Sequence, residues 1–589
     1  MRISDINSVF KNKYILILAL LLIVMNGFSQ IIIKGKIIDD TSSQPIPNVS
    51  IIIENTHIGT ITNNDGVFAM HCGDTLLNGY VIISSLGYKK VIIKLKNLND
   101  SIIRMDRVST TLPEITIISN SNKRDLFSIV QHALLKIRQD NFSETKSKCY
   151  INITTFDNDI PVEIIEALAQ TNFNNINGLT RLTLKTGKIA YSLKNNYKFF
   201  NFEFVKTLTS FSIFRKNNIN NISTPESVCN LNDRKSRKYF SYKSDTTMHY
   251  DKEDVIKINC KNTLKNKPYL NTSIYVGIKS GDVYSLTNYG YVYYNKLFYP
   301  MDNDHHIDSL FIKISYLFKN YPEDSSYLHQ IRFDYTLNYI DSINSRKINS
   351  KYFVYLFGIN KSFFIPKITF TDNDNDYVKL LTLHYDSTFW NKNISMVESK
   401  TEKELKRDIS TKGMFINYNN DNFSVILKTT TINSFLPWSR NNKLTWNDIY
   451  KEDRNEPITL PEDASTKKRL FDEDLYNLDF QIYFDMYQIP DTTLFFSKTL
   501  FSKDNSFYYL ERDSTALNFI NLYFDLYEDT RKSIMGKLNL LKNISSYSVD
   551  SLYNSEIDLL NYRVKKFKEE TKRGTDREKM EKWKNEVMK

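Results

Sequence analysis

Two clusters of acidic and histidine side chains have residue types that could bind a metal ion. In the first, His305-His306 is surrounded by Asp302, Asp304 and Asp308. A zinc site needs several converging ligands, whereas adjacent histidines on a strand point in opposite directions. We therefore interpret this cluster as a polar loop.

The second cluster, Asp372 to Asp376, alternates Asp and Asn as the first half of a calcium-binding loop does. Such a loop also needs a glycine at its sharp turn and a bidentate glutamate at its end. Tyr377 and Leu383 occupy those two positions. The sequence therefore predicts no calcium site here, and we assign neither a metal nor a cofactor to the chain.

Glu163 and Glu166 are the carboxylates that best fit acid–base catalysis outside any known motif. They lie in the segment from Val162 to Ala169, which fits either a short helix or a strand. Their spacing puts them on one face of a helix but on opposite faces of a strand. Because H-E-x-x-H, G-x-S-x-G, P-loop and G-x-G-x-x-G motifs are all missing from the sequence, we name no catalytic residue.

The charge pattern disfavours nucleic acid as a partner. The formal net charge is +11, but Lys and Arg are dispersed among Asp and Glu throughout the chain. A nucleic-acid surface needs basic residues gathered on one face. The hydrophobic content of 41% is high enough for genuine folded cores.

The segment from Ile31 to Asp106 predicts an all-β sandwich. Apolar residues alternate with others at 49–53 and 90–95, which is the period of strands with one buried face. The strongest turn signal in the chain is 63–66, Asn-Asn-Asp-Gly, because its glycine supplies a positive φ. We expect 60–62 and 67–70 to be the two arms of a hairpin around it.

Five blocks of this segment, in order, resemble the carboxypeptidase-regulatory-like (transthyretin-like) β-sandwich. They are Gly35 to Asp39, Pro45 to Val49, Gly59-Thr60, Asn64 to Phe68 and Ser84 to Tyr88. In that family the module is a non-catalytic accessory, found beside metallocarboxypeptidases and at the N-termini of many envelope proteins. The resemblance implies an envelope protein. It implies no peptidase, because no histidine in this chain is followed by Glu three residues later.

Residues 1–29 have the features of a signal peptide. Basic residues precede an apolar run from Tyr14 to Met25, and the small residues Gly27 and Ser29 precede Gln30. The run is too short to cross a bilayer as a helix, and no longer run follows it. We expect cleavage before Gln30 and export to the periplasm or the outer-membrane periphery of a Gram-negative bacterium. An uncleaved N-terminal membrane anchor is the alternative.

After the sandwich, the sequence predicts a helix and then an antiparallel meander. Apolar positions at helical spacing indicate a helix over 122–140, capped by Ser121 or Asn122. Alternating strands are expected at 149–156, 254–260, 272–278, 282–286, 310–314, 331–337 and 351–355. The hairpin at 277–284 resembles that of the curved sheet in LolA-like lipoprotein carriers. Such a sheet can hold an acyl chain, although packing against its own helix is the commoner use.

The predicted fold class is mainly β with added α. It comprises an N-terminal Greek-key β-sandwich, a curved antiparallel sheet with helices, and a helical C-terminal region. The last helix, 559–588, interleaves Lys and Glu, which favours a solvated helix over a partner-binding tail. The expected divisions are the signal peptide 1–29, sandwich 30–107, connector 108–120 ending as a strand, sheet domain 121–394, mixed region 395–514 and C-terminal helices 515–589.

Four cysteines leave the redox state open. Cys72, Cys149, Cys229 and Cys260 are widely spaced, with no C-x-x-C pair. An oxidising envelope permits disulfides, and the three pairings that four cysteines allow cannot be told apart from sequence. Buried free thiols are an equally good interpretation.

Two functions remain from this evidence. The preferred one is a secreted or outer-membrane-associated, non-catalytic envelope protein that binds a partner protein, a glycan or a lipid and has no spanning helix in its mature chain. The alternative is an envelope hydrolase whose site is assembled from scattered residues. A large apolar cavity would favour a lipid carrier, and convergent carboxylates in a cleft would favour the enzyme.

Overall fold

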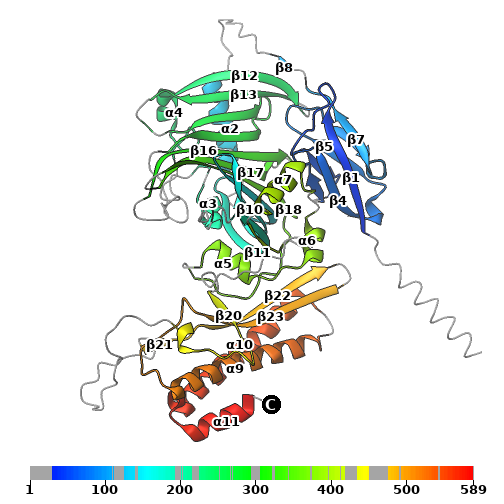
Figure 1. Cartoon of the computed structure of the whole chain (residues 1–589). Helices are drawn as coiled ribbons and strands as arrows, with labels where there is room; N and C mark the ends of the chain where they lie inside the picture. The colour runs from blue at the N-terminus through cyan, green and yellow to red at the C-terminus, as the bar shows by residue number, and fades with distance from the viewer. Residues whose placement is uncertain are drawn as a thin grey trace, which may run out of the picture.

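The computed structural model confirms a mainly β fold with added helices. Figure 1 shows a small sandwich beside a large sheet, with a C-terminal layer of strands and helices below them. The structure describes residues 30–587 except for 57, 109, 112–124, 140–143, 193–200, 202, 212, 215–224, 251–252, 265–266, 268, 293–304, 321–325, 342–343, 372–373, 395–396, 411–412, 418–433, 450–474, 490–491 and 542–543.

The sandwich packs two sheets face to face, with strand orders β4-β1-β7 and β3-β2-β5-β6. Alternate residues, among them Ile37 and Ile51, are fully buried between the sheets, as the period-two pattern predicts. The strands are β1 (Gln30–Asp39), β2 (Ser50–Ile53), β3 (Gly59–Ile61), β4 (Val67–Gly73), β5 (Tyr80–Ser84), β6 (Val91–Lys94) and β7 (Ser101–Met105).

The hairpin expected around the Asn-Asn-Asp-Gly turn is wrong. The turn itself forms, with Gly66 at a φ of 70°, and a Cβ there would collide with the Ile37 carbonyl oxygen. However, β3 pairs with β2 and β4 pairs with β1, so the turn links the two sheets. The Asn63 side chain accepts hydrogen bonds from the amides of Asp65 and Val67, which closes the turn locally. Local turn chemistry therefore fixes the chain reversal but not the sheet that each arm joins.

The large sheet has twelve strands in the order β19-β11-β10-β9-β18-β17-β16-β15-β14-β13-β12-β8. Its meander returns to its start, because β18 pairs with β9. The strands expected from alternation are all present. The members are β8 (Thr110–Thr111), β9 (Thr145–Asp157), β10 (Ile160–Asn174), β11 (Gly178–Ser192), β12 (Phe240–Tyr250), β13 (Glu253–Asn262), β14 (Asn271–Gly277), β15 (Val283–Tyr291), β16 (His306–Asn320), β17 (Ser326–Ile340), β18 (Ser345–Phe357) and β19 (Gly413–Ile416).

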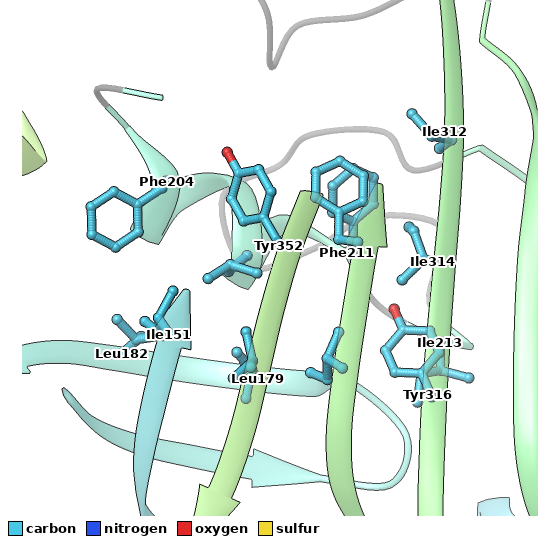
Figure 2. Close-up of a cluster of buried hydrophobic side chains, with 14 of the residues drawn as sticks. Ile151, Leu179, Leu182, Phe204, Phe211, Ile213, Ile312, Ile314, Tyr316 and Tyr352 are labelled. Carbon is cyan, nitrogen blue, oxygen red and sulfur yellow. The ribbon is translucent and has the colours of Figure 1, made fainter. Parts of the chain in front are cut away.

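One face of this sheet, called the inner face here, is filled by the chain's own side chains. The helices α2 (Leu126–Gln139), α3 (Phe204–Ser210) and α4 (Asp233–Tyr239) lie over it. Figure 2 shows the packed cluster, whose labelled members are Ile151, Leu179, Leu182, Phe204, Phe211, Ile213, Ile312, Ile314, Tyr316 and Tyr352. The expected caps of α2, Ser121 and Asn122, lie outside the described residues. Within them, the Asp125 carboxylate accepts a hydrogen bond from the Phe127 amide at the start of α2.

The C-terminal layer packs a small sheet against two long helices. Aromatic side chains such as Phe480 and Phe519 form its core. Its elements, with the helices and strands leading to it, are α5 (Asp376–Thr382), α6 (Ser387–Asn393), α7 (Lys400–Ser410), β20 (Phe435–Pro437), β21 (Tyr476–Asn477), β22 (Phe480–Ile489), β23 (Thr492–Ser502), β24 (Phe507–Tyr508), α9 (Ser514–Leu538), α10 (Ser546–Thr571) and α11 (Arg577–Val587).

The single helix expected over 559–588 is wrong. α10 ends at Thr571, and α11 begins at Arg577. Lys572 and Arg573 have φ values of 45° and 57°, and Gly574 follows at 93°, so the chain leaves the helical region at this point. The two helices then meet through Phe567 and Trp583, whose ring centroids lie 5.5 Å apart.

A buried ion pair joins the large sheet to the C-terminal layer. Lys185 on β11 and Asp485 on β22 form a salt bridge, and neither side chain has any exposed surface. The Lys185 ammonium also donates to the carbonyl oxygens of Phe364 at 3.0 Å and Met486 at 3.1 Å. Asp485 accepts from the Met486 amide at 2.8 Å and from the Tyr483 hydroxyl at 3.2 Å. The pair is therefore fully hydrogen-bonded on both sides.

All four cysteines are free thiols and buried, so the structure holds no disulfide between Cys72, Cys149, Cys229 and Cys260. Burial raises the pKa of Cys229 to about 11 and raises the pKa values of Cys149 and Cys260 further. Among the described residues, none of the helices combines the length and the apolar character needed to span a membrane.

A candidate binding pocket at the junction of the sandwich, the large sheet and α7

A cavity of about 270 Å³, called the junction pocket here, lies where three parts of the fold meet. Its floor is the outer face of the large sheet, opposite the helix-covered inner face. Its wall is the 61–64 segment of the sandwich, and its roof is the 397–405 segment, which includes the start of α7. Figure 1 shows α7 between the sandwich and the sheet. The lining residues are Asn48, Ile61, Thr62, Asn63, Asn64, Tyr150, Asn152, Thr154, Phe156, Glu166, Arg332, Asp334, Lys351, Tyr352, Phe353, Val397, Glu398, Thr401, Glu402 and Leu405.

Strand register arranges the floor in two rows of side chains. Residues opposite each other on neighbouring antiparallel strands share a face, and their strands lie about 5 Å apart. One row consists of Glu166, Asn152, Phe353 and Arg332. The next row consists of Thr154, Lys351 and Asp334. The sheet thus holds acceptors, donors and an aromatic ring at fixed spacing.

Arg332 and Asp334, two positions apart on β17, have unused hydrogen-bonding capacity. Neither side chain forms a hydrogen bond or a salt bridge with the described residues, and the buried Nε atom of Arg332 lacks any acceptor among them. Burial lowers the pKa of Arg332. Burial also raises the pKa of Asp334, although the nearby charges of Lys313, Lys351 and Arg332 oppose that shift. Both charged groups are therefore partly desolvated, and neither has a hydrogen-bond or salt-bridge partner in the part of the chain that the structure describes.

The roof of the pocket is the start of α7, and its acidic residues already have partners. Glu402 and Ser399 form a capping box, in which the Ser399 amide donates to Glu402 at 2.7 Å and the Ser399 hydroxyl accepts from the Glu402 amide at 3.1 Å. Asn152 on the floor donates to the other Glu402 oxygen at 3.4 Å. Burial, reinforced by the charge of Glu166, raises the pKa of Glu402.

Glu166 is held between the floor and the roof. Its carboxylate accepts from the Tyr150 hydroxyl at 2.8 Å and pairs with the Lys406 ammonium at 3.3 Å. Lys406 also pairs with Glu398. Burial alone would lower the pKa of Lys406, but the carboxylates of Glu166 and Glu398 outweigh it, and the pKa is raised.

The sandwich contributes its wall through the same turn that links its two sheets. The Asn63 side chain donates to the Val397 carbonyl oxygen at 2.9 Å. The Asp65 carboxylate accepts from the Lys400 amide at 2.6 Å, at the N-terminus of α7, where a negative charge is favoured. The sandwich is therefore docked onto the pocket's roof by side chains of the Asn-Asn-Asp-Gly turn.

Glu163 and Glu166 do not converge. Both lie on β10, so they point to opposite faces, as their spacing requires for a strand. Glu166 reaches the junction pocket. Glu163 points into the inner face, where it accepts from the Thr155 hydroxyl at 2.9 Å and from the side chains of Asn201 and Tyr377.

The two candidate metal clusters have other roles among the described residues. His306 begins β16, so the expected loop is wrong for this residue. His305 precedes the strand, and its Nδ1 atom lies 2.7 Å from the Tyr339 hydroxyl oxygen. Asp302 and Asp304 lie outside the described residues, as do Asp372 and Asn373.

The rest of the second cluster stabilises a helix start. Asp374 accepts from Thr371, Asn375 caps α5 by accepting from the Val378 amide at 3.0 Å, and Asp376 pairs with Lys379. In the part of the chain that the structure describes, no group of His, Cys, Asp and Glu is arranged to hold a metal ion.

Sequence reasoning missed most of the pocket. Arg332 and Asp334 occupy the polar positions of an alternating strand, which ordinarily indicates a solvated face. A usable signal was present for Glu402, since Ser399 followed by Glu three residues later is a capping-box pattern. That pattern predicts the helix start but not what lies beneath it.

The family comparison concerns the N-terminal sandwich. The model of the CarboxypepD_reg-like domain matches residues 33–117. Residues 33–117 are a CarboxypepD_reg-like domain. The resemblance drawn from the five sequence blocks is thus confirmed, and the Asn-Asn-Asp-Gly turn that docks α7 belongs to the CarboxypepD_reg-like domain. No curated protein matches the chain.

Three solved structures are similar to a later part of the chain. An outer membrane lipoprotein-sorting protein domain from Vibrio parahaemolyticus is 8% identical, with a TM-score of 0.17, over 42% of this chain and 94% of its own. The MucA/MucB complex of Pseudomonas aeruginosa is 5% identical, with a TM-score of 0.13, over 40% and 94%. A LolA superfamily protein from Nitrosomonas europaea is 9% identical, with a TM-score of 0.15, over 39% and 93%. At these TM-scores we draw no function from the likeness.

Proposed function

We propose that this chain is an exported, non-catalytic envelope protein that binds a ligand in the junction pocket. The observation that carries the proposal is the pair Arg332 and Asp334, which are partly desolvated in a cavity and lack protein partners among the described residues. A protein gains nothing for its own stability by burying charges in this way. A ligand that satisfies them would recover that cost.

The inner face supports the proposal by its contents. Side chains of the strands and of the 204–213 segment pack there together, as Figure 2 shows. An acyl chain would have to displace this packed core, with a cost comparable to opening a cavity in it. The polar junction pocket is therefore the better ligand site, and a lipid carrier of the LolA type is the weaker form of the proposal.

One feature of the structure supports the hydrolase alternative. Four carboxylates line the cavity: Glu166, Asp334, Glu398 and Glu402. However, Glu402 is committed to its capping box and Glu166 to Tyr150 and Lys406, so neither is free in this arrangement to attack or to protonate a substrate. Binding is the use that leaves these contacts intact.

Native mass spectrometry of the chain purified from its own envelope fraction tests the proposal. We expect a mature chain beginning at Gln30, the predicted cleavage point, and a retained small mass. Arg332→Ala should lose that mass, because it removes a guanidinium donor that no described residue engages. Lys347→Ala is the control, because Lys347 is exposed on β18 and outside the pocket. A mass retained equally by both variants, or no retained mass in the parent chain, would contradict ligand binding at this site.

A further inference from the structure

We propose that the ligand of the junction pocket is a neutral saccharide unit, held by Arg332 and Asp334 on the sheet and stacked against Phe353. This inference rests on the proposed function, since it names the chemistry of the ligand at that same site.

Arg332 and Asp334 on β17 would bind a ligand that has hydrogen-bond donors and acceptors on adjacent atoms. Arg332 offers only donors, and the ionised Asp334 offers only acceptors. Alternation puts both on one face of the strand, two residues apart. Vicinal hydroxyls fit this arrangement, because each hydroxyl both donates and accepts. One can donate to Asp334 while its neighbour accepts from Arg332.

The remaining lining fits neutral polar groups. Neutral amide and hydroxyl side chains also line the pocket: those of Asn48, Asn64 and Thr401, and those of Asn63, Asn152 and Thr154, which already form hydrogen bonds within the chain. Amides and hydroxyls serve as well for donating as for accepting, so they bind hydroxyl groups without requiring a charge. A zwitterionic peptide end would use Arg332 and Asp334 but would leave most of these groups without matching partners.

An aromatic ring completes the site. Phe353 stands between Asn152 and Arg332 in the floor row, where it is half-buried and lines the cavity. An aromatic face attracts the partly positive C–H groups of a sugar ring, while the sugar's hydroxyls reach the polar residues beside it. Phe156 provides a second ring on the same strand face as Asn152.

Charge and size exclude the other simple ligand classes. Four carboxylates line the cavity against the two cations Arg332 and Lys351, so a phosphate or another compact anion would be repelled. A long acyl chain would leave the amides and carboxylates desolvated without partners. The cavity, at about 270 Å³, is slightly smaller than the pockets of roughly 300 Å³ and above that bind drug-sized ligands. It therefore fits the end of a glycan rather than a long stretch of one.

Isothermal titration calorimetry on the full mature chain tests the inference. The saccharide probes are maltotriose, cellotriose and N,N′,N″-triacetylchitotriose, and the comparison probes are inorganic phosphate, triglycine and palmitate. We expect at least one saccharide to bind with a Kd near or below about 1 mM, and Arg332→Ala and Phe353→Ala to weaken it about tenfold or more.

A matched pair of lysines on β18 supplies the control. Lys351 and Lys347 are both exposed and share a strand face, but only Lys351 lines the pocket. Lys351→Ala should weaken saccharide binding, whereas Lys347→Ala should leave it unchanged. Because both side chains are exposed, neither variant is expected to change the melting temperature, so this comparison stands even if Arg332→Ala folds poorly.

The possible outcomes distinguish the saccharide inference from the proposal that the pocket binds a ligand. Binding of triglycine or phosphate that Arg332→Ala abolishes would overturn the saccharide and leave the pocket as a ligand site. A saccharide that emerges shortened would support the ligand class and overturn the non-catalytic function. No saccharide binding at a concentration of about 10 mM, or binding that the pocket variants do not change, would overturn the saccharide inference.

Discussion

Replacing Lys185 with Met should lower the free energy of unfolding by about 3–5 kcal/mol, the largest effect we expect from a single substitution outside the pocket. The change leaves Asp485 as an unpaired carboxylate with no exposed surface. Burial raises the pKa of Asp485, and the Lys185 charge opposes that shift, so the carboxyl would become protonated once its partner is lost. Urea unfolding followed by tryptophan fluorescence measures the loss. Trp390 is a suitable reporter, because it lies in a cluster with Tyr487 of β22.

Two further variants separate the ion pair from ordinary packing. The double variant Lys185→Met with Asp485→Leu should recover most of the lost stability, because it removes both desolvated charges together. Lys206→Met breaks a surface pair with Glu203 in which both side chains are well exposed, and it should cost less than about 1 kcal/mol. If Lys185→Met cost no more than Lys206→Met, the buried pair would not hold β22 to the sheet.

Glu163→Gln should make the protein less sensitive to pH over the range that begins at about 4.3, the ordinary pKa of a glutamate, and extends upward. Glu163 is buried, and burial raises its pKa despite hydrogen bonds from Tyr377, Asn201 and Thr155. A carboxyl whose folded pKa is raised contributes stability below its unfolded pKa of about 4.3, and loses it as pH rises through the folded pKa. The parent chain should therefore lose stability relative to Glu163→Gln as the pH increases across this window.

Urea midpoints of both proteins at several pH values in that window measure this difference. Glu54→Gln is the control, because Glu54 is exposed and should leave the pH profile unchanged. Glu163→Ala should be more damaging at every pH, by about 3 kcal/mol, since it removes the buried carboxylate that accepts from the Asn201 amide, the Thr155 hydroxyl and the Tyr377 hydroxyl. A constant gap between the parent and Glu163→Gln across the window would show that Glu163 does not titrate with a raised pKa.

Alternation predicted most strands of the large sheet, because the pattern of one buried face is local. It did not separate β10 from a helix, because β10 is buried on both faces. No alternation was recognised around Lys185, so its position was not predicted. The register between β10 and β11 shifts between Leu168 and Ala169, which are paired with Thr186 and Leu184, so Lys185 is the extra residue of a bulge. A bulge redirects a side chain without any signal in the residue types. The partner, Asp485, is also 300 positions away in sequence.

Turn signals predicted where the chain reverses, but they did not predict which strands or helices lie on either side of the reversal. Gly66 marked a real turn, but only the sheet pairing shows that its arms belong to different sheets. Gly574 is a helix-ending residue that the charge pattern of 559–588 concealed. The buried thiols illustrate the same limit, because sequence gives the spacing of the cysteines and only packing decides between thiols and disulfides.

The junction pocket could not be predicted, because no part of it is local. Its floor depends on the pairing of β9 with β18, its roof on where α7 lies, and its wall on the docking of the CarboxypepD_reg-like domain. The resemblance of the segment from Ile31 to Asp106 to a known family predicted that domain's fold and left its contacts open. Arg332 can be recognised as a candidate binding residue only once the strand order shows that it lies under α7 and the sandwich.

Amide hydrogen exchange tests the central claim most directly. It would compare the mature chain from its own envelope fraction with the same chain produced in a foreign host that lacks the ligand. Ligand in the junction pocket should slow exchange at 61–65 and 397–402, the two segments whose backbone closes the cavity. Slower exchange confined to α2 and the 204–213 segment would place the ligand on the inner face instead, and would contradict the account.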